Sequence, residues 1–486
     1  MTIKKLVLFC GTFVDTPELG TLRVRINTTI GVSLMIGNNN NHKKGEIKFI
    51  RENSPNYDIN PILDALEYDP TLHTSEIEVI NLQPGTDWLN GTRFYFPGFI
   101  DTHCHASQYP NSGIFGSSTL LDWLEKYTFP LEASLKEYKL AFNVYSKAVQ
   151  RTITNGTTCC SYYATIDPNS TNLLADICNR LGQRAFIGKV CMDRNCPSYY
   201  KEHNVQECMD NMDIVLNHIS DEIQNDRIKP IITPRFAPTC SQEMLTYLGE
   251  LVKKHRLHVQ THLSENVEEV KWVLQLFPDC KTYTDVYQKF GLLSEKTVLA
   301  HCIHLSEPEL KVLRETGSGV SHCPISNSSI TSGECRVRWL LDNGIDVSLG
   351  TDISGGFSSS ILNTARQAHL VSRHVAMKQK ENKDYYKLNV NECLYIATMG
   401  GAKVLDLQDA IGSFDVGKQF DAQLVDLNTI GSNVDVFEWQ LTDLNDRNNE
   451  KKNMELFHDI IAKWFFNGDR FNTARVWVSG QLIHSI

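Results

Sequence analysis

Short apolar runs alternate with longer helical stretches through the central part of the chain. Apolar and β-branched residues gather in eight runs, at residues 95–105, 156–164, 184–192, 230–238, 258–265, 297–305, 319–325 and 346–353. Helical periodicity or helix-forming composition marks residues 135–153, 244–255, 267–277, 307–315 and 360–378. Eight strands alternating with helices predict an α/β fold, a (β/α)8 barrel of the TIM type, over residues 96–406.

An open, doubly wound parallel sheet is the alternative for this alternation of strands and helices. The dinucleotide-binding form of that sheet carries a Gly-x-Gly-x-x-Gly turn after its first strand. No such turn follows residues 95–105. The region also has about the length of a barrel of ~250 residues with insertions, so the barrel is favoured.

The two ends of the chain read as short strands and turns. Strands are expected at residues 6–14, 31–36 and 47–50, and again at 411–414, 420–427 and 474–483, with a hairpin at 478–482. Between them lie a polar loop at 37–45, a possible short helix at 61–66 and an apolar-faced helix at 455–466. We expect residues 1–95 and 407–486 to pair into one small, β-sandwich-like domain beside the barrel.

Charge and cysteine content narrow the class of protein. The formal net charge is -10, whereas nucleic acids and anionic membranes require a basic footprint. No apolar run approaches the ~18 residues of a membrane span. The 14 cysteines include no Cys-x-x-Cys pair, which favours reduced thiols in a cytoplasmic protein. We therefore expect no nucleic-acid and no membrane partner.

The first strand of the predicted barrel ends in two histidines, His103 and His105. Residues i and i+2 of a strand point to the same face, so both imidazoles can reach one metal ion, while Thr102 and Cys104 face the other way. Alone, the pair is also compatible with two ordinary polar strand residues, and the remaining ligands must come from elsewhere in the chain.

Further polar residues recur at the ends of later strands, where barrel enzymes place their chemistry. His262 ends the fifth run and Glu265 follows it, His301 lies in the sixth, and Asp352 ends the eighth. Each has an ordinary structural explanation: a hydrogen-bonded core histidine, a helix-capping acid or a turn former. Together with the first pair, three imidazoles and one carboxylate around one cation suit zinc with an open position for water.

The chain resembles the amidohydrolase superfamily over nearly its whole length. The segments that carry the resemblance are residues 97–105, 261–265, 300–302, 350–352 and 417–422. Within the superfamily, residues 105–113 and 235–238 are similar to those of the members that deaminate guanine. The resemblance implies one zinc ion per chain, a homodimer, and hydrolysis of guanine at C2, with protonation of N3, to give xanthine and ammonia in purine and guanine catabolism.

The resemblance also assigns roles to individual residues. His103, His105, His262 and Asp352 would hold the zinc ion, and His301 would orient the attacking water. Glu265 would carry a proton from that water to the ring, and Asp352 would share it. His262, Glu265, His301 and Asp352 would therefore also contact the substrate.

Three other residues would recognise the base. Phe236 would offer an aromatic face to the purine, while Gln108 and Arg235 would donate hydrogen bonds to its carbonyl oxygen O6. The alternatives are that Arg235 pairs with a carboxylate and that Phe236 belongs to the core.

Rival functions differ in the residues that they need. Binuclear amidohydrolases use a modified lysine at the end of strand 4, whereas this chain has Arg235 there and Lys229 at the strand's start. Deaminases of the cytidine type need a Cys-x-x-Cys pair, which is absent. Deamination of another purine, a pterin or a triazine-like amidine stays open on physical grounds. A non-catalytic scaffold would have lost ligands or Glu265, and none is missing.

Overall fold

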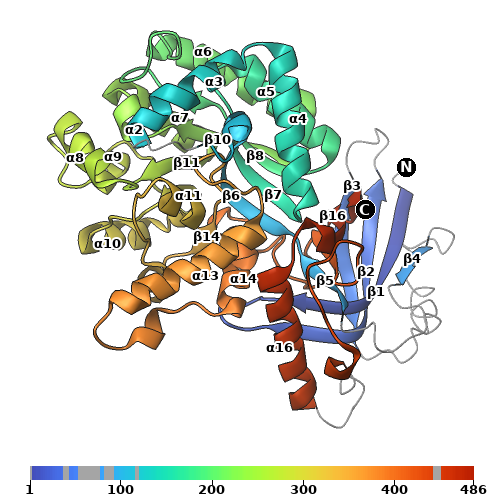
Figure 1. Cartoon of the computed structure of the whole chain (residues 1–486). Coiled ribbons are helices and arrows are strands. Elements are labelled where there is room, and N and C mark those ends of the chain that lie inside the picture. The colour runs from blue at the N-terminus through green and yellow to red at the C-terminus, as the bar shows by residue number, and fades with distance from the viewer. Residues whose placement is uncertain (1–2, 37–42, 53–76, 82–91, 115–119, 442–449) are drawn as a thin grey trace.

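The structure is a computed structural model, and it describes residues 3–36, 43–52, 77–81, 92–114, 120–441 and 450–486 (Figure 1). Most of the polar loop expected at 37–45 lies outside the described residues, and the short helix expected at 61–66 lies wholly outside them.

A sheet of parallel strands forms the centre of the molecule, as the alternating pattern predicted (Figure 1). Its strands follow the order of the chain: β6 (Phe99–His105), β7 (Thr157–Tyr163), β8 (Arg184–Gly188), β10 (Ile228–Pro234), β11 (His258–Leu263), β12 (Thr297–His301), β13 (Gly319–His322) and β14 (Val347–Leu349). The short β9 (Val190–Cys191) also pairs with β10. The first and last strands meet, because the amide of Asp352 donates to the carbonyl of His103 at 2.8 Å. The fold is therefore the predicted (β/α)8 barrel.

Helices surround this sheet (Figure 1). Those expected from the sequence are α4 (Tyr138–Thr154), α7 (Gln242–His255), α8 (Val267–Leu276), α10 (Glu307–Thr316) and α13 (Ile361–Lys378). The sequence analysis missed α5 (Pro168–Leu181), α6 (Val205–Asn217), α9 (Tyr283–Lys289), α14 (Val390–Ala397) and α15 (Met399–Val404). Local capping explains α5: Asp167 accepts a hydrogen bond from the amide of Ser170, and Gly182 ends the helix with a φ of 80°.

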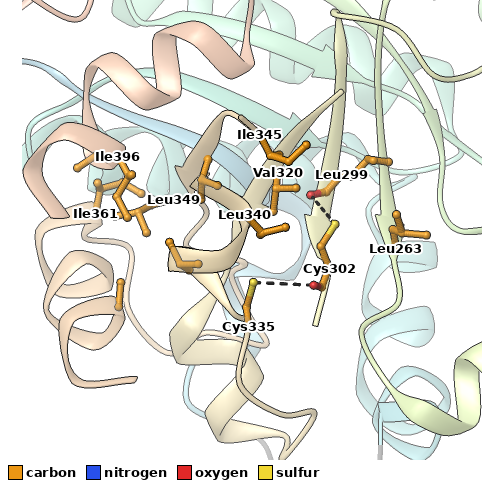
Figure 2. Close-up of a cluster of buried hydrophobic side chains, with 14 of the residues drawn as sticks. Leu263, Leu299, Cys302, Val320, Cys335, Leu340, Ile345, Leu349, Ile361 and Ile396 are labelled. Carbon is orange, nitrogen blue, oxygen red and sulfur yellow. Dashed lines mark hydrogen bonds between the residues drawn. The ribbon is translucent and has the colours of Figure 1, made fainter. Parts of the chain in front are cut away.

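The outward faces of the strands pack against these helices. Figure 2 shows Leu299 of β12, Val320 of β13 and Leu349 of β14 beside Leu340 of α12 (Val337–Asp342) and Ile361 of α13. All five side chains are buried in one hydrophobic cluster. Two cysteines of the same cluster are hydrogen-bonded: Cys302 Sγ donates to the carbonyl of Leu299, and Cys335 Sγ to that of Cys302 (Figure 2). This layer fixes the last strands of the barrel, whose ends carry candidate site residues.

The two chain ends form a second sheet, and Figure 1 shows both termini beside it. Its strands run in the order β17 (Gln481–Ser485), β16 (Thr473–Val478), β15 (Ala422–Asp426), β5 (Arg93–Pro97), β1 (Ile3–Asp15), β2 (Arg23–Ile36) and β3 (Lys43–Arg51), with β4 (Ile77–Asn81) paired to β1. Its core includes Phe9 stacked on Phe420 at 4.0 Å between ring centroids. The hairpin expected at 478–482 is confirmed, and its turn at residues 479–480 joins β16 to β17. The sheet reaches Pro97, two residues past the expected boundary at 95.

One expected strand of this domain is absent. The backbone bends at residues 411–413 and is irregular at 414, and Gly412 has a φ of 93°. Their backbone groups are bound by side chains rather than by a strand: the amide of Phe414 donates to Asp15 at 2.8 Å, and its carbonyl accepts from Arg25 at 3.0 Å. The expected helix at 455–466 is confirmed as α16 (Glu450–Asn467).

The cysteines and the helix lengths add two further facts. All 14 cysteines are free thiols in the structure. Among the helices of the described residues, none combines the length and the apolar character that crossing a bilayer demands.

Candidate metal centre and active site

Four donor atoms converge where the carboxyl ends of the barrel strands meet. The Nε2 atoms of His103 and His105 lie 3.3 Å apart, and those of His105 and His262 also lie 3.3 Å apart. Asp352 Oδ1 lies 3.3 Å from Nε2 of His103 and 3.4 Å from that of His105. A tetrahedral zinc site with bonds of about 2.0–2.1 Å has edges of about 3.3–3.4 Å between its ligand atoms. Four of the six edges between these donor atoms therefore have the length expected of one tetrahedral metal site.

The protonation of these groups also suits a metal ion. Burial lowers the pKa of His103, His105 and His262, which keeps their imidazoles in the neutral form that binds metals. The Nδ1 atom of His262 lies 2.6 Å from the backbone carbonyl of Arg235 and donates to it, which leaves Nε2 free as a ligand. Burial is the largest single influence on the pKa of Asp352 and would raise it, but the hydrogen bond to His103 and the charge interactions with His103, His301 and His105 together hold that pKa below its ordinary range.

His301 and Glu265 lie against this site. His301 Nε2 is 3.5 Å from Glu265 Oε2 and 3.8 Å from Asp352 Oδ2. Asn327 fixes the ring, because its Oδ1 lies 2.8 Å from His301 Nδ1. Burial raises the pKa of Glu265 to about 7, so this carboxyl can both take up and release a proton near neutral pH. Together, His103, His105, His262, Glu265, His301 and Asp352 form what we call the catalytic cluster.

The backbone is unusual at the strand ends that carry the cluster. Ser264, His301, Cys302 and Asp352 have φ values of 52°, 72°, 51° and 45°, in the left-handed region that side chains other than glycine seldom adopt. Such conformations cost about 1–3 kcal/mol each and gather at functional sites. They turn the chain so that His301 and Asp352 point toward the histidine pair.

One detail of the first strand differs from expectation. Thr102 was expected to face away from the histidines, together with Cys104. Instead, its hydroxyl lies 2.7 Å from that of Ser321 and 2.6 Å from that of Ser348, on the last two barrel strands. The pairing of β6 with β7 shifts register between Asp101 and Cys104, and this irregularity breaks the simple alternation of faces.

A pocket opens over the cluster. It encloses about 430 Å³ of space between atoms, which includes the solvent at its open mouth. His105, His262, Glu265 and Asp352 line it, and so do the three predicted recognition residues, Gln108, Arg235 and Phe236. His103 and His301 are fully buried and do not belong to the lining. Seven of the nine predicted site residues therefore line one pocket.

Other residues of the pocket were not anticipated from the sequence. Trp123 and Leu124 add apolar surface from the segment that follows β6, where α2 (Leu120–Trp123) meets the π-helical turn η5 (Leu124–Thr128). Ser326 and Ile330 approach from the segment after β13. Residues of these types are common in every protein and form no recognisable motif here. The sequence therefore gave no indication that Trp123, Leu124, Ser326 and Ile330 line the pocket.

The recognition residues are held by a buried carboxylate that the sequence analysis also missed. Glu132 lies on α3 (Phe129–Ser134), and its Oε2 and Oε1 accept hydrogen bonds from Arg235 Nη1 at 2.7 Å and Nη2 at 3.2 Å. Gln108 Nε2 donates to Glu132 Oε1 at 3.0 Å. Tyr200 Oη donates to Glu132 Oε2 at 2.7 Å. We call Gln108, Glu132, Tyr200 and Arg235 the Glu132 network. The alternative that Arg235 pairs with a carboxylate is therefore correct, and the pocket-lining position is correct as well.

Comparison with known proteins finds guanine deaminases both among similar sequences and among similar structures. The model of the amidohydrolase family matches residues 94–483. A probable guanine deaminase of Schizosaccharomyces pombe is 41% identical over 98% of this chain and 83% of its own length. A guanine deaminase of Dictyostelium discoideum is 38% identical over 99% of this chain and 98% of its own. The crystal structure of guanine deaminase from C. acetobutylicum with bound guanine in the active site superposes with a TM-score of 0.80, at 30% identity, over 99% of this chain and all of the other.

Proposed function

The chain belongs to the amidohydrolase family, and from this premise we propose that it is a zinc-dependent guanine deaminase that converts guanine and water to xanthine and ammonia. The observation that carries the proposal is the catalytic cluster, in which four donor atoms lie 3.3–3.4 Å from their neighbours beside a buried glutamate. The guanine deaminases among its relatives supply the substrate.

The metal site would hold one zinc ion through His103, His105, His262 and Asp352. When bound, zinc lowers the pKa of a coordinated water to about 7 and so supplies hydroxide at neutral pH. Three neutral imidazoles and one carboxylate form a donor set that fits zinc and leaves its net charge positive.

The proton transfers fall to Glu265 and its neighbours. Glu265 takes a proton from the attacking water and delivers it to N3 of the purine, so that addition at C2 does not leave a bare anion on the ring. The C2–O bond forms, and the hydroxyl on C2 then gives up its proton and becomes the C2 carbonyl of xanthine. The amine takes that proton and leaves as ammonia when the C2–N bond breaks. His301 orients the water, since Asn327 holds its ring and Nε2 faces Glu265 and Asp352. Asp352 shares the proton.

The base is recognised by the other residues of the lining. Phe236 presents an aromatic face, and Gln108 and Arg235 offer donors to O6, since each has N–H groups beyond those bound to Glu132. His262, Glu265 and Asp352, which line the pocket, would contact the reacting part of the ring, whereas His301, which does not line it, would act on the ring through the water that it orients.

The rival functions are less well supported. The lining contains no lysine among the described residues, and Lys229 lies near the amino-terminal start of β10 with its Nζ 5.7 Å from the ring centre of Phe186. A binuclear site with a modified lysine at the end of strand 4 therefore has no candidate there. The six residues of the catalytic cluster are all in place, which disfavours a non-catalytic scaffold. A contact to O6 separates guanine from amidines that lack this carbonyl, whereas a pterin carries an equivalent carbonyl and is separated from guanine only by the substrate assay.

Several finer features are part of the proposal. They are a homodimer, a cytoplasmic location, a role in purine catabolism, and division of the chain into a barrel at 96–406 with a small domain from 1–95 and 407–486.

The deciding experiment is a panel of purines, pterins and pyrimidines assayed for ammonia release, with metal analysis of the same sample. We expect guanine to be the best substrate and zinc to be present at about one ion per chain. Faster turnover of a pterin or a pyrimidine would move the assignment to another member of the family, and zinc-loaded protein without any ammonia release would support the scaffold.

A further inference from the structure

Glu132 occupies a position that the proposed chemistry does not use. Its side chain is fully shielded from solvent, and it is not among the residues that line the pocket in the described structure. An isolated carboxylate in such a place would be costly, so its partners must account for it. Those partners include Gln108 and Arg235, the two residues that would read O6 of the base.

The carboxylate has no capacity left for a ligand. Oε2 accepts from Arg235 and Tyr200, and Oε1 accepts from Gln108, from Arg235 and, at 3.5 Å, from the hydroxyl of Ser107. A carboxylate offers about four lone-pair positions, and all are in use. Glu132 can therefore influence a substrate only through the residues that it holds.

Glu132 determines the orientation of the Gln108 amide. Nε2 must face Glu132, because a carboxylate only accepts hydrogen bonds, and Oε1 then accepts from the backbone amide of Ser354 at 3.3 Å. With one N–H spent on Glu132, the second N–H is the only polar hydrogen that this side chain can turn to a ligand. Gln108 is thus presented to the pocket as a donor.

Glu132 also neutralises Arg235. The two parallel N–H···O contacts, at 2.7 and 3.2 Å, form a buried bidentate pair, in which the positive charge is balanced but further N–H groups stay available. A balanced pair donates hydrogen bonds to a neutral carbonyl at little cost, whereas an unbalanced guanidinium would favour an anion.

We propose that Glu132 is a positioning residue that makes this pocket specific for a purine with a neutral carbonyl at C6, by fixing Gln108 and Arg235 as donors and cancelling the charge of Arg235. This inference rests on the proposed function. It predicts that loss of the Glu132 charge weakens recognition of the 6-oxo group and strengthens binding of an anion in its place.

The test is the variant Glu132→Gln, compared with the wild type on guanine and on 2-aminopurine, which has the same ring without O6. We expect kcat/KM for guanine to fall by about tenfold or more, mainly through KM, while kcat/KM or the inhibition constant for 2-aminopurine changes little. Purine-6-carboxylate, which carries a negative charge at this position, should inhibit the variant more strongly than the wild type. A purely structural role would change all three ligands alike.

Two further variants serve as controls. Glu202→Gln removes another buried carboxylate, which pairs with Lys189 at 2.5 Å and does not line the pocket, so it should lower stability without changing the preference for guanine over 2-aminopurine. Glu132→Asp keeps the charge and should retain part of the preference. In a double-mutant cycle with Arg235→Ala, Glu132→Gln should add little further loss.

The outcomes separate this inference from the proposed function. Wild-type protein that releases no ammonia from guanine overturns the function itself. An active wild type with equal losses for guanine and 2-aminopurine in Glu132→Gln, or with unchanged inhibition by purine-6-carboxylate, overturns only the role of Glu132. If Glu132→Gln does not fold, an unchanged preference for guanine over 2-aminopurine in Glu132→Asp overturns the role of Glu132 equally.

Discussion

The catalytic cluster and the Glu132 network meet in one pocket, but different parts of the fold build them. The residues of the cluster lie at the ends of β6, β11 and β12 and just after β11 and β14. The hydrogen-bonded barrel sheet therefore sets the distances between its donor atoms. The network comes from the 3-10 turn η4 (Ala106–Asn111), from α3, from the segment after β9, and from the end of β10. A single carboxylate, Glu132, joins these segments.

This difference separates the chemistry from the choice of substrate. The carboxyl ends of the barrel strands hold the metal ligands at fixed distances. The loops and short helices around them can change in sequence without altering those distances. Changes in the cluster should therefore affect every substrate equally. Changes in the network should alter the ranking of substrates while the metal stays bound.

The largest effect is expected from a metal ligand. His105→Ala removes one of the four donors at 3.3–3.4 Å spacing, so we expect it to lose zinc and to lower turnover of guanine and 2-aminopurine alike by more than about 10⁴-fold, beyond the contribution of one proton-transfer group. Metal analysis and ammonia release check this. Full zinc content with near-normal turnover would remove His105 from the site.

Glu265→Gln is expected to separate metal binding from proton transfer. The variant should keep its zinc, because Glu265 is not a proposed ligand, and should lose about 10² to 10⁴-fold in kcat for every substrate. Metal analysis and ammonia release again check this prediction. Near-normal turnover would be incompatible with Glu265 as the proton carrier, and loss of zinc would place it among the ligands.

Arg235→Ala tests the Glu132 network. Guanine should lose about 10- to 100-fold in kcat/KM, while 2-aminopurine, which has no O6, should lose much less. The variant should also unfold more easily, by about 3–5 kcal/mol, because Glu132 is left buried without its cation, so assays belong well below its melting temperature. Equal losses for both bases would show that Arg235 does not read the carbonyl.

The smallest effect is expected from Asn327→Ala. This side chain accepts from His301 Nδ1 at 2.8 Å and touches none of the proposed ligands, so its removal should free the His301 ring, lower kcat by about tenfold and leave zinc content intact. The preference for guanine over 2-aminopurine should not move. A changed preference would mean that the cluster and the network are coupled.

Much of the fold and of the cluster was predictable because the signals are local. Alternating apolar and helical runs gave the barrel, and the spacing of His103 and His105 placed both on one strand end. The positions of His262, His301 and Asp352 at later strand ends followed from the same reading. The strand expected at 411–414 was wrong, because side chains of Asp15 and Arg25, far away in the sequence, bind its backbone groups.

The network was harder to predict for a physical reason. Glu132 lies 103 residues from Arg235 in the chain, and a buried ion pair leaves no periodicity or spacing at either partner. Gln108, Arg235 and Phe236 were predicted as recognition residues only because the chain resembles a known family. Glu132 was not predicted. The left-handed backbone at His301 and Asp352 could not be predicted either, because only a small share of His and Asp residues adopt a positive φ.

The central claim is that one zinc site does the chemistry, and titration of metal-free protein tests it most directly. Zinc is removed with a chelator and returned stepwise, and ammonia release from guanine is measured at each step. We predict no turnover without metal and a linear rise that saturates at about one zinc per chain. Full activity in the metal-free protein, or a rise that continues to two ions per chain, would contradict the account.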